Sequence, residues 1–449
     1  MSERLCSVGV DVGTTSTQLV VSELTIENRA SSFAVPEMEI AQRRIVYKSP
    51  VYFTPLLTES RVDGQRIRKM VEEEYRKAGI TRETVDTGAI IITGETSRKE
   101  NARAVLDALS DFAGDFVVAT AGPDLESVLA AKGAGAVEFS RQTGQTVLHM
   151  DIGGGTSNLA LIREGKIRET GCLNIGGRLI KLEETGKITY ISPVLTGITP
   201  LKVGDTVTKE QAQKLAAALA EVLEMAAGCR EESDRLRRFT TRETGREWTP
   251  PRERPVLSFS GGVADCIDRE LPWKQYGDLG PLLGQAIRRS ALCQQAYVLG
   301  RETIRATVIG AGSHSTQLSG STVYCQNIRF PLKNIPVVHP QSLEQIEMEL
   351  EKQEGRAVIA LEGLAAPSYS QIAQMAEELL RRIPGEILIC LEQDMAKALG
   401  QALALRCSRD RPILCIDRVR IGEGSYLDIG APIEHALPVV VKTLVLGKG

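Results

Sequence analysis

The 449-residue sequence is poor in aromatic residues and carries little net charge. Phe, Trp and Tyr make up 4% of the chain, and 54 basic residues nearly balance 57 acidic ones, which gives a formal net charge of −3. This balance provides little of the electrostatic attraction on which nucleic-acid binding depends. The scarcity of aromatic side chains also disfavours a surface that stacks bases or sugars. We therefore expect no nucleic-acid partner.

The sequence also lacks the patterns of membrane, disulfide-rich and zinc-binding proteins. No stretch approaches the ~20 apolar residues that are needed to span a membrane, and no signal-peptide core precedes Asp11. The nine cysteines are scattered without a C-x-x-C pair, and the four histidines are equally dispersed. We therefore expect a cytoplasmic protein with reduced cysteines, without a membrane partner and without a metal site built from Cys or His.

Two common nucleotide-binding motifs are missing as well. No G-x-x-x-x-G-K-[ST] segment occurs, and no G-x-G-x-x-G segment opens a predicted helix, which excludes a P-loop NTPase and disfavours a dinucleotide fold. The chain has instead two similar segments whose aspartates lie 140 positions apart, VDVGTTS at 10–16 and MDIGGGTS at 150–157. Each follows a short apolar run and precedes another, a pattern typical of strand, tight turn and strand.

These two segments have the chemistry of a phosphate-binding site. Glycines allow backbone N–H groups to approach an anion, and hydroxyl groups add further donors. An aspartate beside such a loop suits a hydrated divalent cation or a positioned water. A third glycine turn, Gly261-Gly262-Val263, follows the apolar run 256–259. Two facing loops and a third turn predict a protein that holds a nucleotide triphosphate from both sides.

The last part of the chain predicts a separate α/β layer. Between residues 343 and 416, segments with helical spacing of apolar residues alternate with short apolar runs. Such alternation favours a mainly parallel sheet covered by helices. The predicted helices span residues 343–350, 372–380 and 395–405, and the predicted strands span residues 357–361, 386–391 and 412–416.

The order of the two Asp-Gly segments and the later Gly-Gly turn resembles the ATPase superfamily of actin, Hsp70 and the sugar kinases. The resemblance covers about residues 5–300 and implies a two-lobed α/β fold with duplicated phosphate loops, which closes over ATP and Mg²⁺. We accordingly expect a first actin-like lobe with an insertion over residues 1–140, a second lobe with a helical insertion over residues 141–305, and a C-terminal α/β domain over residues 306–449.

The superfamily resemblance also implies which residues form the site. Asp11 and Asp151 would hold Mg²⁺ and position the attacking water. Glu126, in the Ala-rich segment 121–136, would orient that water, and Glu95 is the alternative for this role. The implied nucleotide-binding residues are Gly13, Thr14, Thr15, Gly153, Gly154, Gly155, Thr156, Gly261, Gly262 and Val263.

Two further features have alternative interpretations. The phosphate-contacting lysine of Hsp70 has no clear counterpart, although Arg98 and Lys99 are nearby candidates that otherwise begin a solvated helix. The segment Gly310-Ala311-Gly312-Ser313 resembles another phosphate turn. Because it lies beyond the third glycine turn, a hinge or a structural loop is the favoured interpretation.

A closer resemblance covers nearly the whole chain. Segments 93–102, 121–136, 151–161 and the tail at 428–432 and 437–443 resemble the reactivating factors of ethanolamine ammonia-lyase from ethanolamine-utilisation operons. The resemblance implies a molecular chaperone that uses ATP and Mg²⁺ to release damaged cobalamin, so that intact adenosylcobalamin can rebind. It implies ethanolamine ammonia-lyase as the protein partner and a cytoplasmic location, in association with a bacterial microcompartment.

Two other functions fit the same superfamily. A small-molecule kinase would need an acceptor cleft and a catalytic base between the lobes, and the sequence identifies neither. An ATP-binding scaffold protein would assemble with ATP and leave cobalamin enzymes unaffected. The chain has no D-x-H-x-x-G signature, so direct binding of cobalamin is not expected.

Overall fold

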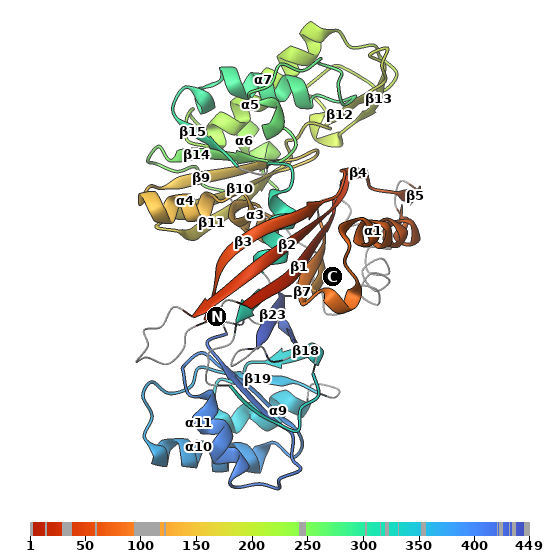
Figure 1. Ribbon diagram of the computed structural model, residues 1–449. Coiled ribbons are helices and arrows are strands. Elements are labelled where there is room, and N and C mark those ends of the chain that lie inside the picture. The colour runs from red at the N-terminus through yellow and green to blue at the C-terminus, as the bar shows by residue number, and fades with distance from the viewer. Residues whose placement is uncertain are drawn as a thin grey trace.

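The computed structural model describes residues 3–443 except for residues 14–15, 29–37, 59–60, 94–116, 121–122, 242–247, 301–302, 315, 319–322, 331, 352–355, 420, 422–424, 431 and 433–436. The chain forms three parts that are arranged along the long axis of the molecule, with the N-terminal part between the other two (Figure 1). A sheet within residues 3–120 lies in the middle of the view, a sheet within residues 147–299 lies above it, and a sheet within residues 316–443 lies below it.

The first sheet surrounds the first glycine-rich segment. Its strands run in the order β3-β2-β1-β7-β8, and β4 pairs with β2. Strand β1 is antiparallel to β2 and parallel to β7, β3 is antiparallel to β2, and β8 is parallel to β7. Helix α1 (Gly64–Ala78) packs on these strands through Ile67 and Val71. The strands are β1 (Glu3–Val12), β2 (Ser16–Asn28), β3 (Met38–Lys48), β4 (Tyr52–Phe53), β7 (Thr87–Ile92) and β8 (Val117–Thr120), and β5 (Leu56–Thr58) pairs separately with β6 (Arg61–Val62).

The second sheet repeats this arrangement. Its order is β11-β10-β9-β14-β15, and the directions match strand for strand: two antiparallel neighbours on one side of β9 and two parallel ones on the other. This repetition is the duplicated, two-lobed actin-like fold that the resemblance implies. The strands are β9 (Val147–Ile152), β10 (Ser157–Arg163), β11 (Lys166–Leu173), β14 (Val256–Ser260) and β15 (Tyr297–Leu299). The remaining elements of this lobe are α4 (Ala136–Thr143), β12 (Ile180–Leu182), β13 (Ile188–Ile191), α5 (Lys209–Ala226), α6 (Asp234–Phe239) and α7 (Gly280–Arg289).

Two helices connect the lobes, because each packs on the sheet of the lobe that it does not follow in sequence. Helix α3 (Pro123–Gly133) follows the first sheet but packs on β9, β10 and β11 of the second, whereas α8 (Ala306–His314) follows the second sheet but packs on β1, β2 and β7 of the first. The two helices also pack on each other. A Cβ atom at Gly133 would lie 1.8 Å from the Ala306 carbonyl oxygen, and one at Gly310 would lie 2.0 Å from that of Leu129. Only glycine permits so close a contact between backbones.

The position of α8 corrects one expectation. Residues 310–313 are neither a phosphate turn nor a loop, because they belong to this helix. Glycine is needed at Gly310 for helix packing rather than for anion binding. Since α8 lies against the first sheet, we propose that the C-terminal domain begins after His314 rather than at residue 306.

The C-terminal part confirms the predicted alternation of strands and helices, but its sheet is mixed rather than mainly parallel, because β16, β17, β22 and β23 pair antiparallel with their neighbours. Strands β18, β19, β20 and β21 are parallel and neighbours in chain order, within a sheet of order β16-β23-β22-β18-β19-β20-β21-β17. Helices α10 and α11 bury Ile372, Leu379 and Leu399 against it. The elements are β16 (Thr316–Leu318), β17 (Tyr324–Gln326), β18 (Leu332–Val338), α9 (Ile346–Glu351), β19 (Val358–Leu361), α10 (Tyr369–Arg382), β20 (Ile387–Leu391), α11 (Ala396–Ala404), β21 (Ile413–Asp417), β22 (Ser425–Ile429) and β23 (Pro438–Thr443).

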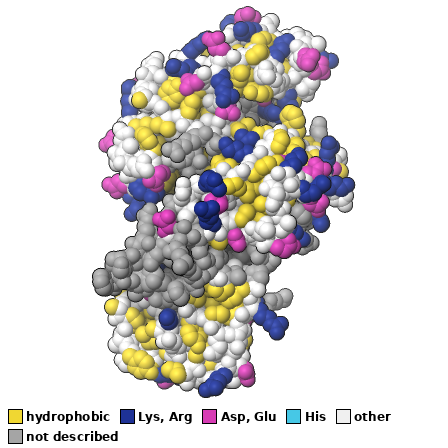
Figure 2. All heavy atoms as spheres, viewed as in Figure 1, with side chains coloured by type: hydrophobic (Ala, Val, Ile, Leu, Met, Phe, Trp, Pro, Cys, Tyr) yellow, Lys and Arg dark blue, Asp and Glu magenta, His cyan; other side chains and the backbone are white. Residues whose placement is uncertain are grey.

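The surface agrees with the composition of the chain. Acidic and basic side chains are interspersed over the two upper parts of the face in Figure 2, without a broad area of one sign. Among the residues that the structure describes, no helix has the length and apolarity needed to cross a lipid bilayer.

Candidate functional site

A cavity of about 450 Å³ lies between the two lobes, where the predicted loops meet. It is lined from both sides by residues that the sequence predicts, and Glu126 reaches it from the first turn of α3. Those residues are Asp11, Gly13, Glu126, Asp151, Gly153, Gly154, Gly155, Thr156, Gly261, Gly262 and Val263. Thr14 and Thr15 fall outside the described residues, as do Glu95, Arg98 and Lys99.

The two phosphate-loop candidates have the same backbone hydrogen bond. The Gly13 N–H donates to the Ser16 carbonyl oxygen at 2.9 Å, and the Gly153 N–H donates to the Thr156 carbonyl oxygen, also at 2.9 Å. Each bond closes a turn between two antiparallel strands, β1 with β2 and β9 with β10. The similarity of the two sequence segments therefore reflects two equivalent turns that face one cleft.

Asp11 and Asp151 are both buried, at 7% exposure, and both accept hydrogen bonds from hydroxyl groups. Thr93 Oγ1 donates to Asp11 Oδ1 at 2.9 Å, while Asp151 accepts from Ser260 Oγ and from Thr307 Oγ1. Burial, together with the charge of Asp151, raises the pKa of Asp11 to about 7 despite the Thr93 bond. Burial likewise raises the pKa of Asp151 to about 6. A cation between these carboxylates would favour the ionised form of both.

The residues present fit a hydrated Mg²⁺ ion. Mg²⁺ prefers oxygen ligands and retains several waters. The side chain opposite Asp11 on β2 is Gln18, whose buried Oε1 has no hydrogen-bond partner among the described residues. No group of three or more His, Cys, Asp or Glu side chains within the described ranges is arranged to hold a metal directly. Asp11 and Asp151 would therefore hold the ion through its waters.

The raised pKa values predict a pH effect on stability. Because the folded-state pKa values of Asp11 and Asp151 exceed those of an unfolded chain, the folded protein binds more protons at mildly acidic pH. This contribution to stability is full below about pH 4 and is lost as the pH rises through about 6 and 7. Denaturant titrations in the presence of a chelator should show wild type losing stability relative to Asp11→Asn between about pH 4 and pH 7, with little further change above pH 7. Parallel curves for the two proteins would contradict the prediction.

Arg178 is a site residue that the sequence analysis missed. It is the only Lys or Arg among the described residues that line this cavity. Its Nε donates to Asp278 Oδ2 at 3.1 Å, and its backbone N–H donates to the Gly154 carbonyl oxygen at 2.6 Å. The preceding Gly177 donates to the Gly153 carbonyl oxygen at 3.0 Å. The Gly176-Gly177-Arg178 segment after β11, which ends at Leu173, is the signal that could have revealed it.

His149 is a second residue that sequence reasoning did not place at the site. It is fully buried, and burial lowers its pKa to about 3, so the ring is neutral. Its Nε2 lies 2.9 Å from Ser260 Oγ, and its Nδ1 lies 3.0 Å from Ser258 Oγ. An ionised Asp151 only accepts, so Ser260 donates to it and in turn accepts from Nε2–H. Ser258 then donates to Nδ1, so each of the three hydrogen bonds from Ser258 through His149 and Ser260 is donated in the direction of Asp151.

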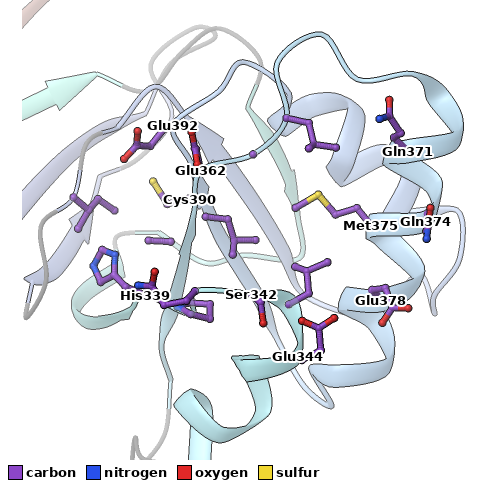
Figure 3. A pocket seen from close by; sticks show the side chains of 18 of the residues that line it. His339, Ser342, Glu344, Glu362, Gln371, Gln374, Met375, Glu378, Cys390 and Glu392 are labelled. Carbon is purple, nitrogen blue, oxygen red and sulfur yellow. The ribbon is translucent and has the colours of Figure 1, made fainter.

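A larger cavity, of about 600 Å³, lies in the C-terminal part at the carboxyl ends of β18, β19 and β20 (Figure 3). Its labelled acidic side chains are Glu344, Glu362, Glu378 and Glu392, which extend from the short 3-10 helix Leu343–Gln345, from the loops after β19 and β20, and from α10. No Lys or Arg is among the described residues that line it. The interlobe cavity is also lined by carboxylates, but of the two cavities it is the one that combines Arg178 with glycine turns whose backbone N–H groups can bind phosphate, so it is the better site for a nucleotide.

Comparisons with known proteins show the family of the chain. The family model described as "Ethanolamine utilisation protein EutA" matches residues 3–447. The chain belongs to the EutA family. It is 36% identical over 474 residues to a Salmonella typhimurium protein and 36% identical over 481 residues to one from Escherichia coli, both named "Ethanolamine ammonia-lyase reactivase EutA", and each match covers 99% of both chains. The match includes the C-terminal part, so that part belongs to the architecture of the EutA family.

Solved structures with a similar arrangement are more distant. A Ppx/GppA family member from Aquifex aeolicus is 14% identical, with a TM-score of 0.44 over 69% of this chain and 97% of that one. The ethanolamine utilization protein EutJ from Carboxydothermus hydrogenoformans is 17% identical, with a TM-score of 0.33 over 68% of this chain and 89% of that one.

Proposed function

We propose that this protein is an ATP-dependent reactivase of ethanolamine ammonia-lyase, which releases damaged cobalamin so that adenosylcobalamin can rebind. One observation carries the proposal: two equivalent Asp-Gly turns face each other across one cleft, in a chain related over its whole length to curated reactivases. The same relationship supports ethanolamine ammonia-lyase as the partner, and a cytoplasmic location in association with a microcompartment.

The cleft residues would act on ATP mainly by positioning it. Asp11 and Asp151 would hold Mg²⁺ through waters, and Glu126 would orient the water that attacks the terminal phosphate. Backbone N–H groups of the loops at Gly13 and Gly153–Thr156 would bind the phosphate oxygens on which charge develops. Gly261, Gly262 and Val263 would lie along the adenosine. Mg²⁺, when bound, supplies further compensation of the phosphate charge.

Loss of the terminal phosphate would change the angle between the lobes. The cleft is lined from both lobes, so a ligand that contacts both sides favours a closed arrangement. The crossing of α3 and α8 provides the connection about which the lobes would rotate. We propose that this rotation pulls on the lyase and loosens its hold on damaged cobalamin.

A reactivation assay tests the function. Ethanolamine ammonia-lyase inactivated with cyanocobalamin is mixed with this protein, ATP, Mg²⁺ and fresh adenosylcobalamin, and ethanolamine deamination is followed. We expect activity to return with ATP and to remain absent with a non-hydrolysable analogue. Phosphate transfer to a small molecule, or ATP-dependent sedimentation without reactivation, would instead support a kinase or a scaffold.

A further inference from the structure

We propose that Arg178 binds the terminal phosphate of the bound nucleotide, and that the contact between Arg178 and Phe53 couples this binding to the position of the first lobe. The inference rests on the proposed ATP site and concerns how that site is coupled to lobe closure. It assigns a role to two residues that neither the sequence motifs nor the proposed hydrolysis uses.

Arg178 contacts both lobes at the cleft. Its Cζ lies 5.4 Å from the ring centroid of Phe53, which belongs to β4 of the first lobe, and its Nε is bonded to Asp278 of the second lobe. The backbone bond to Gly154 fixes Arg178 to the second phosphate loop. A displacement of that loop therefore reaches a side chain of the opposite lobe directly.

The charges in the cleft favour a phosphate contact by this guanidinium. Arg178 is the sole basic side chain among the described lining residues, and its two terminal nitrogens make no hydrogen bond to another described residue. A guanidinium binds phosphate through its edge, which leaves its flat face free to stack on an aromatic ring. The lining carboxylates are Asp11, Glu126, Asp151, Asp265 and Asp278.

Phe53 is exposed, so its contact with Arg178 can strengthen when the cleft closes. Its side chain is 77% exposed, although large aromatic side chains usually contribute to a core, and the guanidinium of Arg178 is the cation over its ring. Asp278 is 5% exposed and accepts from both Arg178 and the Gly280 N–H, so it holds the guanidinium at a fixed point. A terminal phosphate on the edge of Arg178 would order the side chain and strengthen its contact with Phe53. ADP leaves that edge without a partner.

The test compares ADP with a non-hydrolysable ATP analogue, both with Mg²⁺, by titration calorimetry and small-angle X-ray scattering. The variants are Arg178→Lys, which retains the charge beside Asp278, and Phe53→Ala, which removes an exposed ring. Lys181→Ala is the matched control, because Lys181 lies 5.3 Å from the Tyr190 ring and does not line the cleft.

We expect wild type and Lys181→Ala to be more compact with the ATP analogue than with ADP. Arg178→Lys should lose about 10-fold or more in affinity for the ATP analogue and much less for ADP. Phe53→Ala should lose the extra compaction, with an affinity loss of about 2- to 5-fold for the analogue. The inference would be overturned if Arg178→Lys kept the wild-type ratio of affinities for the ATP analogue and for ADP. It would also be overturned if Phe53→Ala compacted as fully as wild type, or lost the same affinity for both nucleotides. A wild-type protein that binds neither nucleotide would overturn the proposed ATP site itself.

Discussion

Asp151→Asn is expected to lower ATP turnover about 1,000-fold and to abolish lyase reactivation, while the protein remains folded. Asparagine has the size of aspartate and keeps one oxygen that can accept from Ser260. It lacks the negative charge that would hold Mg²⁺ through water, and it presents an NH₂ group in place of one carboxylate oxygen. Phosphate release measures turnover, and thermal unfolding followed by circular dichroism measures the fold.

Asp268→Asn is the matched control for this substitution. Asp268 is exposed, accepts from Tyr297 OH, and is not among the residues that line the cleft. Its replacement should leave turnover near the wild-type rate. An Asp151→Asn protein that still reactivates the lyase with ATP would refute the role proposed for Asp151.

Gly133→Ala should destabilise the protein by about 3 kcal/mol or more, which is at the upper end of the costs measured for overpacking. The new methyl group would lie 1.8 Å from the Ala306 carbonyl oxygen and 2.7 Å from the Gly310 nitrogen. Both atoms are backbone, so no side chain can rotate away, and the two helices must separate. Urea denaturation measures the loss in the free energy of unfolding.

Gly385→Ala provides the comparison for Gly133→Ala. A Cβ atom at Gly385 meets no atom within 4 Å. This variant should lie within about 1 kcal/mol of wild type, in either direction. If the two substitutions have equal effects, the close approach of α3 and α8 does not limit stability.

The predicted part of the site is the part encoded by local sequence. The turns after Asp11 and Asp151 could be recognised because glycine, hydroxyl and aspartate stand together between apolar strands. Of the two residues that were missed, Arg178 has only the preceding Gly176-Gly177 pair as a local signal, and His149 has none. Arg178 reaches the cleft only because its backbone bonds to Gly154, and His149 connects to Asp151 only through Ser260 on a neighbouring strand. These contacts depend on which loops and strands the fold brings together, and a single sequence does not specify that.

The same distinction separates the correct parts of the fold from the incorrect one. The alternating elements between residues 343 and 417 follow from apolar periodicity and were predicted closely. From the sequence alone, residues 310–313 resemble a phosphate turn, and a hinge or a structural loop is the favoured interpretation. Gly310 is instead helical, since its missing Cβ makes room for the Leu129 carbonyl oxygen on a helix that is distant in sequence.

The packing of α3 and α8 on opposite lobes determines which parts of the molecule would rotate as one rigid unit. Helix α8 packs on the first sheet and contacts β16, the first strand of the C-terminal sheet, while β23 of that sheet contacts β8. The C-terminal domain is thus attached to the first lobe through two separate segments. When the cleft opens or closes, the first lobe and the C-terminal domain should turn as one arm and the second lobe as the other. A partner protein bound to both of these units would be deformed by their relative rotation, which binding to one lobe alone would not cause.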